Sequence, residues 1–142
     1  QYKGAEGELV RLAKCCAPIK GEPIIGYITS GKGITVHSQR CPLVAKDILD
    51  SVRQVEVSWD ESIKGSFKAR LLIRALDAPG VLAKITGNIA ELAGNIAKAE
   101  VLTFPDKKAQ IKLSLLVGDI QQLEAIIKKI AANEEVYYTV RT

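Results

Sequence analysis

The stretch LDAPGVLAKITGNIAELAGNIAKAEV, residues 76–101, predicts a turn, a helix and the start of a strand. Asp77-Ala78-Pro79-Gly80 has the composition of a turn, because proline and glycine favour the backbone angles that turns need. Apolar residues then recur at helical spacing over residues 81–92, and Gly94 is expected to end that helix. Residues 95–104 follow as a strand, so the helix should pack back against the sheet that this strand joins.

Periodic segments on both sides complete the pattern. Apolar residues alternate with polar ones over 67–75 and again over 111–117, as in half-buried strands. Asp119 and Gln122 have the spacing of a capping box, and a helix with one apolar stripe follows them. A last strand is expected over 136–140. The order βαββαβ is that of the ferredoxin-like split βαβ fold, and it assigns the chain to the α+β class.

The first half of the chain is expected to form a separate, smaller module. It holds all three cysteines and the single histidine of the sequence. The polar stretch 60–65 ends in glycine and is predicted to be a linker, with a Cys/His module over 1–59 and the ferredoxin-like domain over 66–142. A module this small buries little apolar surface, so a metal would help to hold it together.

The secondary structure of this first module is predicted from weaker signals. Short apolar segments indicate strands over 24–29 and 34–37. A helix is expected over 42–51, followed by a strand over 52–59. The module is therefore predicted to be a small α/β unit.

Composition limits the classes of function. The 20 basic and 16 acidic residues give a net charge of +4, which does not by itself indicate nucleic acid. No apolar run approaches the roughly 20 residues of a membrane span, so no membrane partner is expected. The sequence lacks the features of a signal peptide and an initiator methionine, which suggests a fragment of a longer protein. An odd cysteine count with two adjacent cysteines favours reduced thiols and a cytoplasmic location.

The side chains Cys15, Cys16, His37 and Cys41 are candidate metal ligands. Three thiolates and one imidazole suit a closed tetrahedral zinc site, and His37-x3-Cys41 has a usual ligand spacing. Adjacent cysteines reach one ion only where the backbone bends, and Pro18 is compatible with a bend. Two other interpretations stay open: buried cysteines that simply pack, or a catalytic Cys/His pair.

The segment CCAPIKGEPIIGYITSGKGITVHSQRCPLV, residues 15–44, resembles the zinc-finger, or RIS, segment of RelA/SpoT proteins. That family has two adjacent cysteines, a P-x-x-G-D-x-I-x-G-Y segment, a G-x-G-[IV] turn and an H-x-x-x-C-P end. Glu22 stands here where the family usually has Asp. The resemblance implies zinc-ligand roles for Cys15, Cys16, His37 and Cys41, some members of the family being described without metal.

The stretch 76–101 resembles the core of an ACT domain, which commonly binds an amino acid at its Pro-Gly turn, often across a dimer interface. A branched-chain amino acid and a homodimer through this domain are therefore expected. The candidate ligand-binding residues are Asp77, Ala78, Gly80, Val81, Leu82 and Asn95. Free N–H groups at the start of the helix would favour a carboxylate. The alternative is that Asp77 only caps the helix, Val81 and Leu82 are core, and the domain serves dimer contacts alone.

Together the two resemblances imply the C-terminal regulatory region of a bifunctional (p)ppGpp synthetase/hydrolase, acting in the stringent response on the upstream catalytic domains. Neither a His-Asp hydrolase motif nor a G-x-x-x-x-G-K-[ST] loop occurs, so this region is not expected to be an enzyme. In that family this region contacts ribosomal RNA, with tRNA as a further candidate partner; the basic residues that could do so are Lys14, Lys20, Lys32 and Arg40. A free-standing amino-acid-binding or dimerisation module, without ribosome association, is the alternative, and a thiol-dependent enzyme a third.

Overall fold

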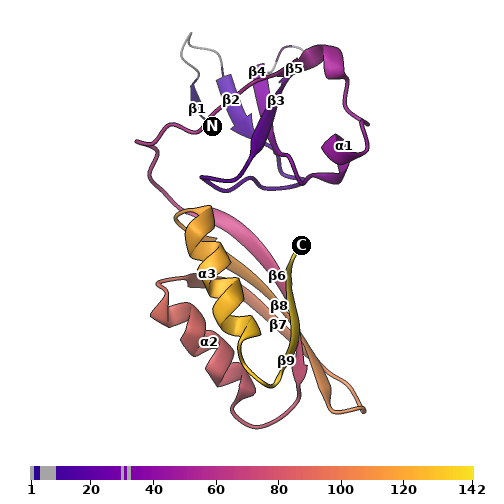
Figure 1. Cartoon of the computed structure of the whole chain (residues 1–142), viewed down its shortest axis with the longest axis vertical. Helices are drawn as coiled ribbons and strands as arrows, with labels where there is room; N and C mark the ends of the chain where they lie inside the picture. Colours follow the sequence, from indigo (N-terminus) through magenta and orange to yellow (C-terminus); the bar gives the residue numbers. More distant parts are fainter. Residues whose placement is uncertain (1, 4–8, 30, 32) are drawn as a thin grey trace. The chain divides into compact units, whose positions relative to one another are not determined.

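The computed structural model forms two compact units, Gln1–Lys64 and Gly65–Thr142, coloured along the chain in Figure 1. The structure describes residues 2–3, 9–29, 31 and 33–142. Within these residues no helix is both long enough and apolar enough to cross a membrane.

The second unit is a four-stranded antiparallel sheet with two helices on one face. Its elements are β6 (Phe67–Leu76), α2 (Val81–Glu91), β7 (Asn95–Thr103), β8 (Lys108–Val117), α3 (Ile120–Ala131) and β9 (Val136–Arg141). The strand order is β7-β8-β6-β9, and Figure 1 shows α2 and α3 beside each other against the sheet. The predicted α+β class and the βαββαβ order of this unit are confirmed.

Alternation along the two central strands builds the core of this unit. Every second residue of β6 from Phe67 to Ala75, and of β8 from Ala109 to Val117, is buried. The antiparallel register sets Leu71 opposite Leu113, so buried side chains of neighbouring strands meet on one face. Each large aliphatic side chain buried there contributes about 1.5–3 kcal/mol. The second unit therefore has a core that needs no bound group.

The helix α2 ends before Gly94, as expected, but the left-handed residue at its end is Ala93. Ala93 has a φ of 61° and closes the helix, and the N–H of Gly94 donates to the carbonyl of Ile89 at 2.9 Å. Gly94 is required for a different reason, since a Cβ there would lie 2.8 Å from Ile89 Cγ2 and 2.9 Å from Ile126 Cδ1. Glycine at this position lets the backbone pack directly on the core.

The first unit is a five-stranded mixed sheet with little helix. Its elements are β1 (Tyr2–Lys3), β2 (Leu9–Leu12), β3 (Ile24–Thr29), β4 (Gly33–Ser38), α1 (Pro42–Ala45), the 3-10 turn η1 (Ser51–Arg53) and β5 (Gln54–Val55). The order is β1-β2-β4-β3-β5, with β2 parallel to β4. The strands predicted over 24–29 and 34–37 are present, whereas β1 and β2 were not expected.

Two elements of the first unit are shorter than predicted. The helix expected over 42–51 ends after one turn, because Asp47 adopts a left-handed φ of 53° and the Ile48 N–H donates back to the Leu43 carbonyl at 3.0 Å. The strand expected over 52–59 pairs only at Gln54 and Val55. The residues after Val55 leave the sheet, and this part of the prediction was wrong.

Candidate metal centre

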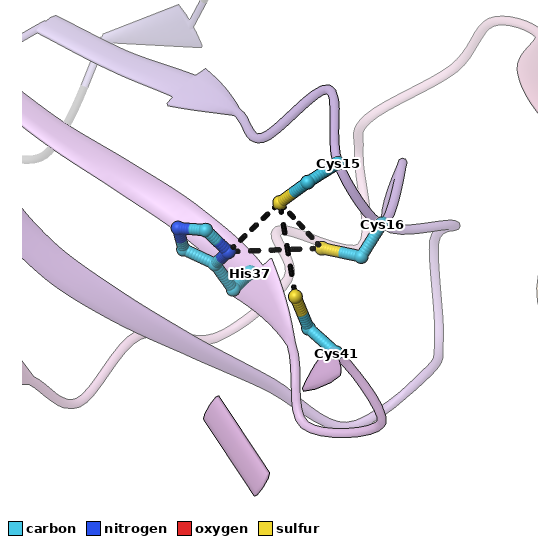
Figure 2. A group of neighbouring side chains, drawn as sticks. All are labelled: Cys15, Cys16, His37 and Cys41. Atoms are coloured by element: carbon cyan, nitrogen blue, oxygen red, sulfur yellow. Dashed lines mark hydrogen bonds between the residues drawn. The ribbon is translucent and has the colours of Figure 1, made fainter. Parts of the chain in front are cut away.

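Three thiols and one imidazole converge in the first unit. The turn after β2 supplies Cys15 and Cys16, β4 supplies His37, and the residue before α1 is Cys41. The ligand atoms of all four lie within 4.8 Å of one another, and Figure 2 shows them pointing toward a common centre. Cys16, His37 and Cys41 are buried, while Cys15 is exposed. The side chains that the sequence singled out are thus brought together from three separate segments.

The spacing of these atoms fits a tetrahedral zinc ion. Zinc–sulfur bonds of about 2.3 Å and zinc–nitrogen bonds of about 2.0–2.1 Å give tetrahedral edges of roughly 3.8 Å between sulfurs and roughly 3.6 Å from sulfur to nitrogen. Cys15 Sγ lies 3.7 Å from Cys41 Sγ and 3.5 Å from His37 Nδ1. Cys16 Sγ lies 3.8 Å from the same nitrogen and 4.0 Å from Cys15 Sγ. The donor set and these four distances therefore fit a zinc site.

A sharp bend lets two adjacent cysteines face one point. The N–H of Ala17 donates to the carbonyl of Ala13 at 3.0 Å, which closes a single turn around Cys15 and Cys16. Ala17 itself has a φ of 43°, in the left-handed region that costs an L-residue roughly 1–2 kcal/mol. Pro18 follows and directs the chain away from the turn. The bend that the adjacent cysteines require is present.

The protonation of the thiols is set by burial and by their neighbours. Burial raises the pKa of the Cys16 thiol to about 12 and also raises the pKa of Cys15, with Cys41 adding to both effects. Burial alone would raise the pKa of Cys41 too, but the backbone N–H groups of Leu43 and Val44 and the other two thiols outweigh it and lower this pKa. Metal binding at neutral pH would therefore release protons from Cys15 and Cys16.

The histidine is held in the form that a metal ligand needs. His37 lies on β4 opposite Ile25, with 6% of its surface exposed. Burial lowers its pKa, so the ring is neutral at pH 7. The Tyr27 ring packs edge-on against it, at 5.6 Å between centroids. The Nδ1 atom therefore faces the sulfurs from a fixed ring, and a neutral imidazole has a lone pair to offer there.

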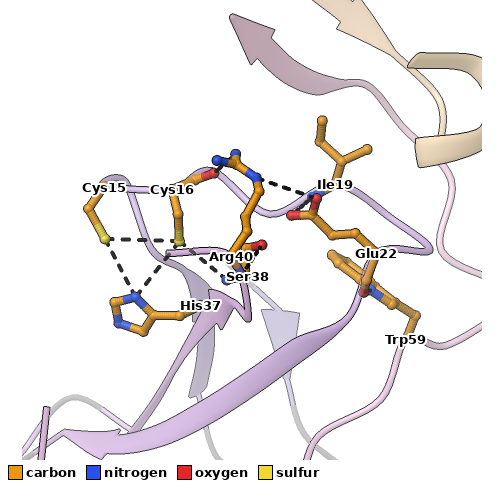
Figure 3. Close-up of polar contacts among 8 residues, drawn as sticks. All are labelled: Cys15, Cys16, Ile19, Glu22, His37, Ser38, Arg40 and Trp59. Carbon is orange, nitrogen blue, oxygen red and sulfur yellow. Dashed lines mark hydrogen bonds and ion pairs between the residues drawn. The ribbon is translucent and has the colours of Figure 1, made fainter. Parts of the chain in front are cut away.

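A buried carboxylate beside the cluster was not recognised as part of the site from the sequence. Glu22 is 5% exposed, and Figure 3 shows it between Ile19, Arg40 and Trp59. Arg40 connects it to the carbonyl of Cys16. The only sequence signal was the acid at this position in the RIS pattern.

The basic residues expected to contact RNA have different surroundings. Lys14 is exposed next to the cysteine turn. Lys20 and Arg40 both donate hydrogen bonds to backbone carbonyls of their own unit. Lys32 lies outside the described residues.

The residues expected to bind an amino acid do not all meet within one chain. Leu76, which precedes the Pro-Gly turn, pairs with Lys108 at the start of β8. Asn95 pairs with Leu116 near the other end of the same strand. The eight residue steps from Lys108 to Leu116 span about 27 Å of strand. Asn95 could join the turn residues at one ligand only through a second copy of the chain.

The turn itself is built around Gly80. This residue caps α2 with a left-handed φ of 84° and gives no side-chain hydrogen bond, so Asp77 is not the helix cap. Asp77 is exposed and Ala78 half-buried. Val81 is buried in the core at 3% exposure, whereas Leu82 is 42% exposed. Only Leu82 of this apolar pair presents its side chain at the surface.

Comparison with known protein families gives each unit a counterpart. The family model described as the RelA/SpoT RIS domain matches residues 1–60, and that of the ACT domain matches residues 64–141. A GTP pyrophosphokinase of Myxococcus xanthus is 36% identical over 139 residues, and a bifunctional (p)ppGpp synthase/hydrolase RelA of Mycobacterium tuberculosis is 34% identical over 134. These matches cover 96% and 94% of this chain but 18% of each relative.

A solved structure supports the fold of the second unit. The crystal structure of the ACT domain from the GTP pyrophosphokinase of Chlorobium tepidum superposes with a TM-score of 0.50 at 23% sequence identity. The match covers 55% of this chain and all of that domain.

A Cys/His unit followed by a ferredoxin-like unit is thus a combination that other proteins share. The chain belongs to the RelA/SpoT family, with an RIS domain followed by an ACT domain. The relatives have their catalytic domains outside these two regions, which confirms the expectation that this part is not itself the enzyme.

Proposed function

We propose that this chain is a zinc-binding regulatory region of a RelA/SpoT-type (p)ppGpp synthetase/hydrolase, working in the cytoplasm on catalytic domains elsewhere in the protein. The observation that carries the proposal is the cluster of three thiols and one imidazole within a matched RIS domain, directly followed by an ACT domain. The three cysteines are free thiols, which suits a reducing compartment. Cys15, Cys16, His37 and Cys41 would hold the ion, and zinc would serve as a structural cross-link.

The first unit is proposed to sense starvation through contact with ribosomal RNA and a bound tRNA. Lys14 is the best-placed basic residue, since it is exposed beside the cysteine turn. Arg40 would act on RNA mainly by holding that turn, because its guanidinium already donates to a carbonyl there. Phosphate contacts of this kind weaken as salt rises.

Cosedimentation with ribosomes tests this role. The wild-type chain is expected to pellet with ribosomes at low salt and progressively less as salt increases. Lys14→Ala should weaken the association at every salt concentration, while Lys128→Ala, an exposed charge change on α3, should not. A wild-type chain that stays in the supernatant at low salt would support the alternative, a free-standing ligand-binding or dimerisation module.

The second unit is proposed to bind a branched-chain amino acid between two copies. The distance between the turn at Gly80 and Asn95 supports a site shared by a dimer. Leu82 would contact the aliphatic side chain, and Asp77 the ammonium group. Calorimetric titration with valine, isoleucine and leucine, run beside a measurement of oligomeric state, tests both parts. A dimer that releases no heat with any of the three would leave only the dimerisation role.

A further inference from the structure

A loop next to the metal centre is fixed by a buried carboxylate. Glu22 Oε1 accepts a hydrogen bond from the Ile19 N–H at 3.1 Å, and its Oε2 lies 3.9 Å from Arg40 Nε. A buried carboxylate is costly unless it is paired and hydrogen-bonded, so both contacts matter to the loop over residues 18–23. Figure 3 shows Glu22 reaching from this loop toward Arg40.

Arg40 extends this contact to the ligands themselves. Its Nη2 donates to the carbonyl of Cys16 at 2.8 Å, and its backbone N–H donates to Ser38 Oγ at 3.2 Å. The Ser38 N–H in turn donates to Cys16 Sγ at 3.3 Å. Arg40 and Ser38 lie between His37 and Cys41 in the sequence, so these bonds join the cysteine turn to the segment that supplies the other two ligands.

The same loop also holds the segment that leads out of the first unit. Trp59 Nε1 donates to the carbonyl of Glu22 at 2.9 Å. Lys20 Nζ donates to the carbonyl of Glu61 at 3.0 Å and to that of Ile63 at 2.7 Å. Residues 59–63 are therefore fixed by a loop whose other side is fixed to the cysteine turn.

We infer that Glu22 and Arg40 are positioning residues for the metal centre, and that their loop couples metal occupancy to the order of residues 59–63. The inference rests on the proposed metal site. With the ion bound, the cysteine turn is held, Arg40 keeps its place against Cys16, and Glu22 keeps the loop in contact with Trp59. Loss of the ion releases the turn, and the exit segment loosens with it. The regulatory region would then transmit the state of its metal to the connection between its two units.

Metal affinity tests the first half of the inference. Cobalt(II) gives visible absorption bands in a tetrahedral thiolate site, so its binding to the whole chain can be titrated directly. Glu22→Gln and Arg40→Gln should each weaken cobalt binding about 10- to 100-fold, the usual effect of losing a partner that orients a ligand. Glu22→Asp, which retains the charge, should recover most of the affinity. Glu56→Gln and Arg53→Gln remove exposed charges of the same unit and serve as matched controls.

The second half of the inference is the coupling of metal occupancy to the order of residues 59–63. It is tested by the fluorescence of the single tryptophan, Trp59, and by hydrogen exchange. Removing the metal with a chelator should shift Trp59 emission to longer wavelength and speed exchange at the N–H groups of Ser62 and Ile63. Lys20→Met should speed exchange at those two residues without weakening cobalt binding, because Lys20 contacts the exit segment and not the ligands. Far-UV circular dichroism of each variant confirms that the chain is folded.

The outcomes separate the inference from the function proposed above. If the wild-type chain binds cobalt while Glu22→Gln and Arg40→Gln bind it as tightly, the positioning roles are wrong and the metal site stands. If chelation leaves both the Trp59 emission and the exchange of residues 62–63 unchanged, the coupling is wrong. A wild-type chain that binds neither cobalt nor zinc overturns the metal site and this inference together.

Discussion

The two units of this chain are stabilised in different ways. Among the described residues, 22 aliphatic, aromatic and cysteine side chains form the buried core. Six of these belong to the first unit, where Pro18 is buried as well: Ala13, Cys16, Ile19, Tyr27, Val36 and Cys41. Two of those six are candidate metal ligands, and Ala13 packs with them in one cluster. In the first unit two candidate ligands, Cys16 and Cys41, are therefore part of the core. In the second unit the core is complete without the residues proposed to bind a ligand.

This difference predicts which substitutions change the stability of each unit. A change at the metal centre should act on the stability of the first unit as strongly as a core change acts on the second. A change in the surface turn of the second unit should leave its stability nearly intact, because surface substitutions usually alter it by no more than about 0.5 kcal/mol.

Loss of a metal ligand should give the largest effect. Cys41→Ser removes a thiolate, and structural zinc contributes about 10–16 kcal/mol of binding free energy in small zinc domains. That is as large as the whole stability of a typical domain, roughly 5–15 kcal/mol, so the first unit should lose its cooperative unfolding transition. Elemental analysis should show one zinc per wild-type chain and none in the variant. The proposed difference between the two units would be contradicted if the variant kept its zinc and still showed the unfolding transition of the first unit by Trp59 fluorescence.

A core truncation should affect the second unit alone. Ile126 is fully buried in α3, so Ile126→Ala should lower the free energy of unfolding of this unit by about 2–5 kcal/mol. Zinc content should stay at one per chain, which makes this variant the reciprocal control for Cys41→Ser. Denaturant unfolding followed by circular dichroism measures the change. Loss of zinc in this variant would show that the two units are not independent.

Two substitutions at the end of α2 should have smaller effects and should change the stability of the second unit in opposite directions. Gly94→Ala should destabilise the second unit by about 1–3 kcal/mol, since the new Cβ meets Ile89 and Ile126 at less than 3 Å. Ala93→Gly relieves a left-handed alanine worth roughly 1–2 kcal/mol, offset by about 0.5–1 kcal/mol of glycine entropy. A slight stabilisation is therefore expected at position 93. The same sign for both variants in thermal unfolding would refute this account of the helix end.

The smallest expected effect is on how the stability of the second unit depends on acid pH. Lys84 hydrogen-bonds Glu135 at the surface and lowers the pKa of that carboxyl below its usual 4.5. The stabilisation is thus fully present above the unfolded pKa and is lost as pH falls through the lower folded value. Lys84→Met should make the melting temperature of the second unit less sensitive to acid and change it little at neutral pH. If the wild-type chain and the Lys84→Met variant were equally sensitive to acid, the Lys84–Glu135 pair would contribute nothing to stability.

The second unit was predictable because its signals are local. Alternation in β6 and β8 and the apolar stripe of α3 each follow from a few neighbouring residues. The sequence predicted that α2 would end at Gly94 but not why glycine is needed there, since a glycine needed for packing looks the same in sequence as a glycine needed for a left-handed turn. Only the three-dimensional contact with Ile126 distinguishes them.

The first unit was harder to predict because its order comes from distant contacts. β2 is half-buried without alternation, and it pairs with β4 only in the folded chain. Gly33 marks that pairing, since a Cβ there would lie 2.1 Å from the carbonyl oxygen of Leu9, but nothing near Gly33 in the sequence reveals it. The candidate ligand set was predicted from residue types and from the resemblance to the RIS segment, whereas Glu22 required the fold to show what it contacts.

The pairing of β6 with β9 sets the order in which the chain folds during synthesis. Leu71 pairs with Arg141, so the central sheet of the ACT domain cannot close until its last strand has been made. The contacts of the first unit are complete by residue 64. At about 5–20 residues per second, a ribosome takes roughly 4–16 s to synthesise Gly65–Thr142, the unit that forms the ACT domain. Under the metal site proposed above, the cysteine turn would therefore acquire its ion while the ACT sheet is still open. The first unit is the part of this region that can fold first on a nascent chain.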